Sequence, residues 1–304
     1  MSGGIKMRSA VGSQGAVHGL DALQKRHETG QTLPTLLCDG QGCGVPVRFV
    51  PAHTQRGTDR HAVVEMPGYI TLDKGAEHVP GCRYNAPGRL AALLASVSDP
   101  DFVQPQDDGK HELRLLGLHQ GLKRGATDAR LDGHLHTLAD LLAVRAMCGS
   151  DDLIASQVVL RLGKKKVAWE NFFYDQERYD AAWHRLDAAS NDVPLALVGT
   201  VRSHRAAQGD AAQGATFLNC APKYQQSGVM DRREFVEVSV GHDDAAWLQT
   251  FPVGAEIIMV GLWRHGRTST STRPHPTDPR RTITNVTYKL SLRPSSRFQL
   301  ATVY

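Results

Sequence analysis

Four residues that can bind a metal stand in two close pairs in the first third of the chain. Cys38 and Cys43 frame a glycine-rich turn in "LLCDGQGCGVPVRF", and His78 and Cys82 lie in "KGAEHVPGCRYN". Zinc prefers four tetrahedral thiolate or imidazole ligands, which proteins often supply as two pairs from two short turns. The C-x4-C and H-x3-C spacing therefore predicts a structural Zn²⁺ site.

The same residues have a second explanation, in which the cysteines are reduced and buried and the histidine is a surface residue. The chain has five cysteines in 304 residues, which argues against a disulfide framework and leaves metal binding and burial as the alternatives. Glu77 stands beside the histidine, but there is no HExxH or H-x-E…C-x-x-C arrangement, so we favour a structural zinc over a catalytic one. His53 and His61 lie between the pairs and are candidates to replace one ligand.

This cysteine and histidine pattern resembles the N-terminal zinc-binding region of the CoiA competence-protein family. The resemblance covers Cys38 to Cys82 and includes "VPVRF", and it implies a small zinc-binding module that precedes other domains. Members of that family also carry a nuclease domain built on an acidic and lysine motif. Here "VVLRLGKKK" has the lysines without the acid, so the resemblance does not extend to nuclease activity.

Basic residues are concentrated in the last third of the chain. From Leu195 to Tyr304 there are 13 Lys and Arg against 8 Asp and Glu, whereas the whole chain has 35 against 31. This excess indicates an anionic partner for the C-terminal region, and arginines in loops rich in Ser, Thr and Pro are suited to phosphate groups. The arginines that we expect to bind a nucleic-acid backbone are Arg202, Arg205, Arg264, Arg267, Arg273, Arg280 and Arg281.

Aromatic side chains in the same region offer flat surfaces on which bases can stack, an interaction worth about 1 to 3 kcal/mol per base. In "REFVEVSVG", alternate residues of a strand face opposite sides, so Phe235 and Glu237 share one face and the neighbouring valines take the other. The valines suit a core, which turns Phe235 outward. The candidate stacking residues are Phe217, Tyr224, Phe235 and Trp263.

The strands that carry these residues follow the order expected of an OB-fold, a small barrel that binds oligonucleotides on one sheet face and its loops. A helix-length insert, "HDDAAWLQTFPVG", separates the third strand-like run from the fourth. The five runs are "LALVGTVRSH", "ATFLNCAP", "REFVEVSVG", "EIIMVGLWRH" and "TITNVTYKLSLR".

Three pieces of this region resemble the single-stranded DNA-binding protein (SSB) family. They are "LALVGTV", "REFVEVSVGHDDAAWLQTFPVG" and "IIMVGLWR", and the resemblance covers about Leu195 to Leu292. It implies that Phe235 and Trp263 stack on bases and that Arg264 contacts the nucleic-acid backbone.

The rest of the chain divides into three further segments. Residues 1–31 are rich in Gly, Ser and Gln and are predicted to be a flexible N-terminal segment. Residues 32–88 form the zinc-binding module, and residues 89–193 form a mixed middle region with a leucine-patterned helix over His134–Arg145. The stretch "NDVP" marks the boundary to an OB-like domain over residues 194–304. The predicted fold class is α+β and multidomain, with a small β-rich zinc-binding module, a mainly helical middle region and a five-stranded OB-like β-barrel.

Several classes of protein are disfavoured. The sequence has no run of eighteen apolar residues and no apolar segment followed by a cleavage site, so we expect neither a membrane span nor a secretory signal, and we expect the protein in the cytoplasm. It also lacks a Walker A loop, a Rossmann glycine fingerprint and a nucleophile elbow.

The sequence therefore predicts a non-enzymatic, zinc-containing protein that binds single-stranded DNA. One alternative is a metal-dependent, nuclease-like enzyme that processes nucleic acid, with its site among residues of the middle region that also suit ordinary surface ion pairs. Those residues are Asp132, His134, His136 and Asp140. Another alternative is a scaffold subunit that binds protein partners or further copies of itself.

Overall fold

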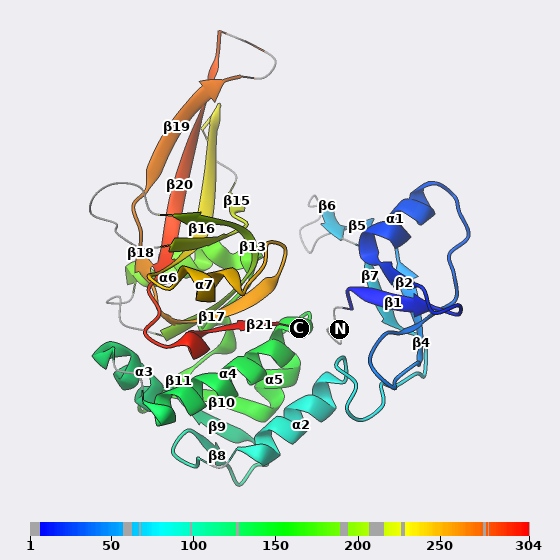
Figure 1. Cartoon of the computed structure of the whole chain (residues 1–304), viewed down its shortest axis with the longest axis horizontal. Coiled ribbons are helices and arrows are strands. Elements are labelled where there is room, and N and C mark those ends of the chain that lie inside the picture. Colours follow the sequence, from blue (N-terminus) through cyan, green and yellow to red (C-terminus); the bar gives the residue numbers. More distant parts are fainter. Residues whose placement is uncertain are drawn as a thin grey trace. The chain divides into compact units, whose positions relative to one another are not determined.

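The structure is a computed structural model of mixed α/β type, in which strands form the larger share and the described part of the chain contains seven α-helices (Figure 1). By its internal contacts the chain divides into two compact units, Met1–Ser96 with Met147–Ile154, and Val97–Ala146 with Ala155–Tyr304. None of the described helices is long and apolar enough to span a membrane. The described residues are 7–56, 63–66, 68–97, 99–125, 128–188, 194–206, 216–225, 229–275, 278 and 280–303.

The first unit is built on a five-stranded antiparallel sheet with the order β2-β1-β3-β4-β7. Val47 and Ile70 are buried in its core, and β5 and β6 pair separately as a hairpin. The elements of this unit are β1 (Ser9–Gly12), β2 (Val17–Gly19), α1 (Leu20–Glu28), β3 (Leu36–Cys38), β4 (Pro46–Val50), β5 (His53–Arg56), β6 (Val63–Met66), β7 (Tyr69–Leu72) and α2 (Ala86–Ser96).

The N-terminal segment differs from the expectation of a flexible stretch. Within residues 7–31 the chain forms β1, β2 and α1, and β1 pairs with β3 in the register Ala10 to Cys38. Ala10 and Leu23 are both completely buried. The burial of these two apolar side chains in the core of this unit stabilises the segment. Its polar composition alone does not predict an ordered structure.

In the second unit a four-stranded sheet with the order β11-β10-β9-β8 lies beside helices. The leucine-patterned helix is confirmed as α4, whose leucines from Leu135 to Leu142 are completely buried. The sheet was not predicted in this form, because β8 and β9 are short and their pairing with β10 joins distant segments. The elements are β8 (Val103–Pro105), β9 (His111–Arg114), α3 (Leu115–Arg124), α4 (Ala129–Met147), β10 (Val158–Leu162) and β11 (Lys165–Val167), and α5 (Asp152–Gln157) spans the boundary between the two units.

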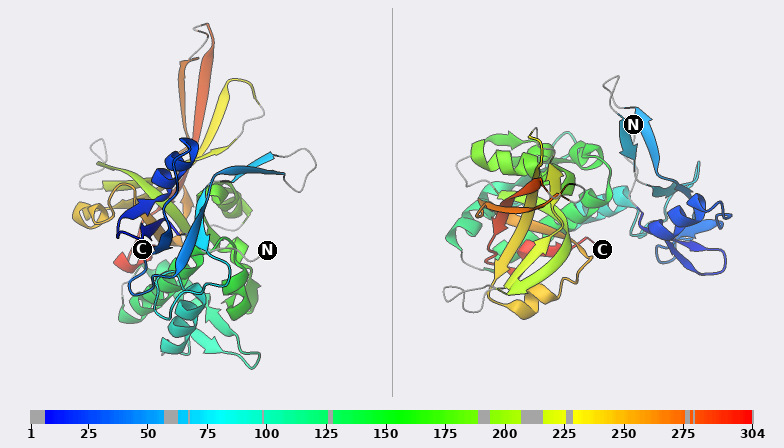
Figure 2. Two further views of the ribbon diagram at one scale, coloured as in Figure 1. Left: turned by 90° about the vertical axis from the view of Figure 1, so that its right-hand side faces the viewer. Right: turned by 90° about the horizontal axis from the view of Figure 1, so that it is seen from above.

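The C-terminal strands form a larger sheet that curls into a half-barrel (Figures 1 and 2). Its main order is β18-β20-β16-β14-β13-β17-β21, and the five predicted strands correspond to β13, β14, β16, β17 and β20. The predicted insert contains α7 (Ala245–Gln249) between β16 and β17. The strands are β12 (Phe173–Tyr174), β13 (Pro194–Ala206), β14 (Thr216–Cys220), β15 (Lys223–Gln225), β16 (Arg232–His242), β17 (Glu256–Leu262), β18 (Arg264–His265), β19 (Ser269–Pro274), β20 (Thr282–Leu292) and β21 (Leu300–Thr302).

The concave interior of the curled sheet is apolar. Val236, Val238 and Val240 of β16 lie in one cluster with side chains from α6 (Tyr179–Ala188) and α7. The 3₁₀ turns of this region are η1 (Trp169–Asn171), η2 (Gln176–Arg178) and η4 (Arg297–Gln299). The predicted boundary "NDVP" lies outside the described residues except for Pro194, where β13 begins.

Candidate functional site

The predicted cysteine and histidine residues meet at one point in the first unit. Cys38 ends β3, Cys43 lies in the turn before β4, and His78 and Cys82 lie in the segment before α2. Their ligand atoms all lie within 4.8 Å of one another. The Sγ atoms of Cys38 and Cys82 are 3.7 Å apart, and His78 Nδ1 is 3.5 Å from Cys43 Sγ and 3.6 Å from Cys82 Sγ. This cluster can hold a metal ion.

Local backbone hydrogen bonds form the two turns that carry these ligands. Cys43 N donates to Gly40 O at 2.9 Å, and Cys82 N donates to Val79 O at 3.1 Å. A Cβ atom at Gly40 would lie 2.5 Å from Cys82 Sγ, so glycine is needed where the first turn passes the second. Gly40 N also donates to Cys38 Sγ at 3.4 Å, which favours the thiolate form that binds metals.

Burial and hydrogen bonding set the protonation of the ligands. Burial raises the pKa of Cys38 and of Cys82 and lowers the pKa of His78. Burial also acts to raise the pKa of Cys43, but hydrogen bonds with the backbone of Val79 and Val45 outweigh it and lower that pKa. A neutral imidazole is the form that binds a metal, and a bound cation favours the thiolates that burial disfavours.

An ion pair that the sequence did not indicate joins the two ligand turns. Asp39 follows the first cysteine and Arg83 follows the last, and Arg83 Nη2 donates to Asp39 Oδ2 at 2.7 Å. Ser9 Oγ of β1 donates to the same oxygen at 2.5 Å. The Asp39 side chain is only 8% exposed. These contacts hold both turns against the sheet, as the outer hydrogen bonds of metal sites commonly do.

The two alternative histidine ligands are not part of this cluster. His53 is exposed, and its Nδ1 lies 3.0 Å from Pro51 O. His61 lies outside the described residues.

A second candidate site lies on the convex face of the curled sheet, here called the outer face. Because side chains alternate along a strand, the residues between Val236, Val238 and Val240 lie on the opposite side of the sheet. Of these, Glu237 and Ser239 are themselves buried. The register of the neighbouring strands extends this face across the sheet. It includes Arg205, Phe217, Asn219, Tyr224, Arg233, Phe235, Glu237, Ser239, Gly241, Arg264 and Lys289.

Three aromatic rings belong to the outer face, those of Phe217, Tyr224 and Phe235. Phe217 is in register with Gly241, where a Cβ atom would lie 2.8 Å from Phe217 Cε1. The ring of Phe217 therefore lies against the backbone of β16. Tyr224 is in register with Phe235, with ring centroids 5.6 Å apart at 64°, and Tyr224 is 52% exposed. Tyr224 is thus exposed, whereas Phe217 and Phe235 are only partly exposed.

Cationic side chains lie on the same sheet face as these rings. Arg205 is in register with Phe217, Lys289 with Glu237, and Arg264 with Ser291. Arg202 Nη2 donates to Glu237 Oε1 at 3.1 Å. The sequence interpretation missed Arg233 and Lys289, although the alternation in "RREFVEV" and "TYKLSL" contains the signal that would have found them.

The structure places Trp263 elsewhere. Its side chain is completely buried, and its Nε1 donates to Leu195 O at 3.1 Å. Trp263 is therefore a core residue and offers no surface on which a base can stack, contrary to the expectation from the sequence.

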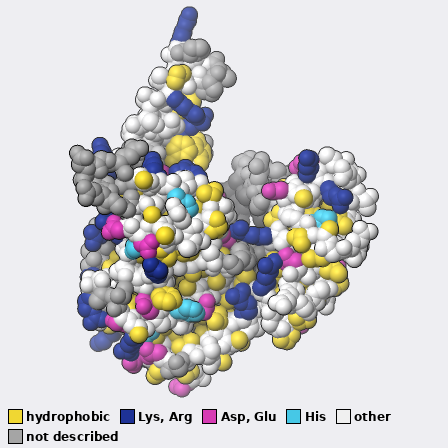
Figure 3. Space-filling view, viewed as in Figure 1, with side chains coloured by type: hydrophobic (Ala, Val, Ile, Leu, Met, Phe, Trp, Pro, Cys, Tyr) yellow, Lys and Arg dark blue, Asp and Glu magenta, His cyan; other side chains and the backbone are white. Residues whose placement is uncertain are grey.

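The remaining predicted arginines lie beyond the outer face. Arg267 and Arg273 are exposed, and β19 and β20 project from the curled sheet with Lys and Arg side chains along the projection (Figures 1 and 3). Arg280 is also exposed, whereas Arg281 donates from Nε and Nη2 to the two carboxylate oxygens of Asp231, at 2.8 and 2.6 Å.

The acidic and histidine residues of the middle region do not form one site. His136 Nδ1 lies 3.3 Å from Asp140 Oδ2 on the helix surface, as an ordinary ion pair would. His134 Nε2 lies 2.8 Å from Asp99 Oδ2. Asp132 accepts from Ser296 Oγ at 2.5 Å. Each group thus has its own partner.

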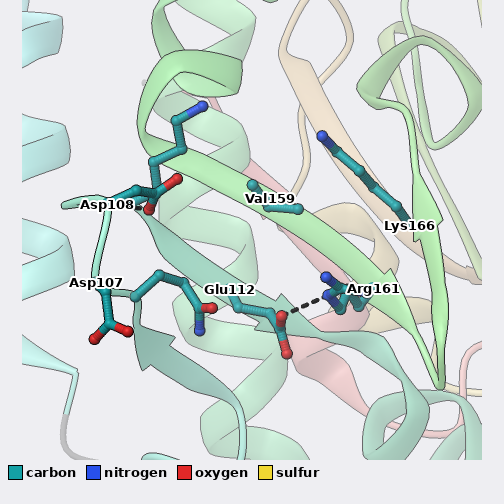
Figure 4. A pocket seen from close by; sticks show the side chains of 8 residues that line it. Asp107, Asp108, Glu112, Val159, Arg161 and Lys166 are labelled. Carbon is teal, nitrogen blue, oxygen red and sulfur yellow. Dashed lines mark hydrogen bonds and ion pairs between the residues drawn. The ribbon is translucent and has the colours of Figure 1, made fainter.

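A polar hollow of about 370 Å³ lies on the four-stranded sheet of the second unit (Figure 4). Glu112 lies at its centre, where Arg161 Nε and Arg114 Nε donate to its two oxygens at 2.5 and 3.0 Å. Two guanidinium groups already neutralise this carboxylate, so it is poorly suited to bind a metal. The lining residues are Gln106, Asp107, Asp108, Lys110, Glu112, Val159, Arg161 and Lys166.

Comparison with known proteins gives no family assignment. No protein-family model matches the chain, and no curated protein matches it.

Proposed function

We propose that this protein binds single-stranded nucleic acid, in particular single-stranded DNA, on the outer face of the curled sheet. The observation that carries the proposal is the placement of Phe217, Tyr224 and Phe235 among cationic side chains on one sheet face. Single-strand binding needs aromatic surfaces for the bases and cations for the phosphates. A duplex keeps its bases stacked inside, so aromatic rings on an open face favour single strands.

The strand pairing supports the proposal that the sheet is an OB-like barrel. β13 pairs with β14, β14 with β16, and β16 runs parallel to β20. The segment from β17 to β18 pairs with β13 at one end and with β20 at the other. The chain between β17 and β18 thus connects a neighbour of β13 to a neighbour of β20, which is the connection that an OB-like barrel needs. OB-folds bind oligonucleotides on the face of their second and third strands, which here are β14 and β16.

We also propose that the metal of the first unit is a structural Zn²⁺. At a Zn–S distance of about 2.3 Å, two ligands of a tetrahedral site are roughly 3.7 to 3.8 Å apart. The sulfur atoms of Cys38 and Cys82 have a separation of 3.7 Å. Three thiolates and one imidazole form a soft donor set that suits zinc. Four protein ligands fill the coordination sphere, so the role of the ion is to stabilise the fold.

Fluorescence anisotropy tests the nucleic-acid proposal. A labelled, mixed-sequence single strand of thirty nucleotides and its duplex are titrated with the full chain. We expect tighter binding of the single strand, and we expect the variant Phe217→Leu, Tyr224→Leu, Phe235→Leu to weaken it by at least tenfold, since each stacked base contributes about 1 to 3 kcal/mol.

The matched control is Phe298→Leu, because Phe298 is 44% exposed on η4, outside the outer face. Equal binding of single strand and duplex, or equal affinity of the aromatic variant and the control, would refute the proposal.

A further inference from the structure

Glu237 places a carboxylate among the aromatic and cationic residues of the outer face. Its side chain is 11% exposed, so it forms part of the floor of the face rather than its rim. Arg202 Nη2 donates to Oε1 at 3.1 Å. In the described part of the chain Arg202 is the hydrogen-bonding partner of Glu237, and Oε2 retains its capacity to accept a hydrogen bond.

The neighbours of Glu237 put it where the edge of a stacked base would lie. Phe235 precedes it by two residues on the same face of β16, and such residues are separated by roughly 7 Å, which is close to the width of a base. Lys289 lies in register beside Glu237 on β20. On the other side, Ser239 Oγ donates to Asn219 Oδ1 at 2.9 Å, and both residues are buried.

The charge of Glu237 determines which part of a bound nucleotide can lie over this residue. A carboxylate repels a phosphate, so the phosphates follow the surrounding cations and the base lies over Glu237. An ionised carboxylate accepts hydrogen bonds and donates none. Cytosine, adenine and guanine have exocyclic amino groups that donate. Thymine and uracil have a carbonyl oxygen where cytosine has its amino group, and their one donor at that edge, the ring N3–H, lies between two carbonyl oxygens.

We propose that Glu237 selects the base, so that the outer face prefers amino-bearing bases to thymine and uracil. This inference rests on the proposed function. A thymine or uracil over Glu237 can donate only from its ring N3–H, which brings a carbonyl oxygen on each side toward the carboxylate, and this repulsion weakens binding. Arg202 keeps the carboxylate in position and occupies one of its oxygens.

Competition between homopolymers on the wild-type protein tests the preference directly. Labelled oligo(dC), oligo(dT) and oligo(dU) of thirty nucleotides are titrated at pH 8, where cytosine N3 is unprotonated. We expect oligo(dC) to bind about tenfold more tightly than oligo(dT), since one good base contact discriminates by about 1 to 3 kcal/mol. Oligo(dU) should bind as weakly as oligo(dT), because the preference depends on the amino group of the base and not on the methyl group of thymine.

The variant Glu237→Gln tests whether Glu237 is the source of this base preference. An amide both donates and accepts, so the ratio of the oligo(dC) and oligo(dT) affinities should fall to about one. Glu234→Gln is the matched control: Glu234 lies on the same strand at an inward position and accepts from Arg232 Nε at 2.7 Å. This control should keep the wild-type ratio.

The outcomes separate the inference from the function on which it rests. If the wild-type protein binds oligo(dC) and oligo(dT) tightly and equally, the base selection is wrong and the proposed function stands. If it binds none of the three oligonucleotides and no mixed-sequence strand, the proposed function fails. If the preference exists but persists in a folded Glu237→Gln protein, Glu237 is not its source. The wild-type comparison remains decisive if the variant does not fold.

Discussion

Three cations of the outer face should account for a measurable part of the salt dependence of DNA binding. Arg205, Arg264 and Lys289 lie on three different strands, and the described residues give none of them an ion-pair partner. Replacing all three by alanine removes three positive charges from one face. Because none of them pairs with a carboxylate, the change leaves no buried charge behind and should have little effect on folding.

The expected effect follows from counterion release. Each phosphate contact to a single strand contributes about 0.7 to the slope of log K against log[salt], so three contacts contribute about 2. At 0.1 M salt this corresponds to an affinity about a hundredfold weaker than that of the wild type, and the difference should disappear as the salt concentration approaches about 1 M.

Anisotropy titrations of a mixed-sequence single strand at five salt concentrations measure the slope. The control is Lys164→Ala, Lys165→Ala, Lys166→Ala, which removes the same net charge from exposed positions at the turn of β10 and β11. The reasoning is refuted if this control lowers the slope as much as the face variant, or if the face variant keeps the wild-type slope.

Three further predictions concern the fold. Cys82→Ser should remove the proposed zinc ion, which elemental analysis of the wild type should detect at about one per chain, and should expose the first unit to proteolysis. Cys148→Ser, which changes a buried cysteine outside the cluster, should retain the metal. Trp263→Ala should lower the free energy of unfolding by about 3 to 5 kcal/mol in urea denaturation; a folded variant with unchanged stability would contradict its role in the core. The hydrogen bond from His134 lowers the pKa of Asp99 to about 2, so the carboxylate stabilises the fold above about pH 4 and this stabilisation is lost as the pH falls toward 2. The difference in unfolding free energy between wild type and Asp99→Asn should therefore shrink over that range, and a constant difference would show that the charge of Asp99 is not its cause.

The metal ligands could be predicted from the sequence because the information is local. Each pair lies within one short turn, and glycines in the first turn indicate a tight backbone path. The ion pair between Asp39 and Arg83 joins residues 44 positions apart. No local pattern reveals such a contact, although both residues stand directly beside predicted ligands.

The alternation of side chains along β16 predicts two faces, with the valines on one and Phe235 and Glu237 on the other. Burial in the structure separates these faces less sharply, because Val236 to Gly241 are all buried and Phe235 is partly exposed. In β17 the residues Ile257 to Val260 are all buried, so alternation gives no direction and could not show that Trp263 points into the core. The order of the N-terminal segment depends on pairing with β3, which a polar composition does not indicate.

Ultraviolet crosslinking of a mixed-sequence single strand to the full chain, followed by mass spectrometry, tests the central claim most directly. Zero-length crosslinks form where a base contacts a side chain, so the crosslinked peptides identify the binding surface. We predict crosslinks at Phe217, Tyr224 and Phe235. Crosslinks confined to the first unit, or to the hollow around Glu112, would contradict the assignment of the outer face as the nucleic-acid-binding surface.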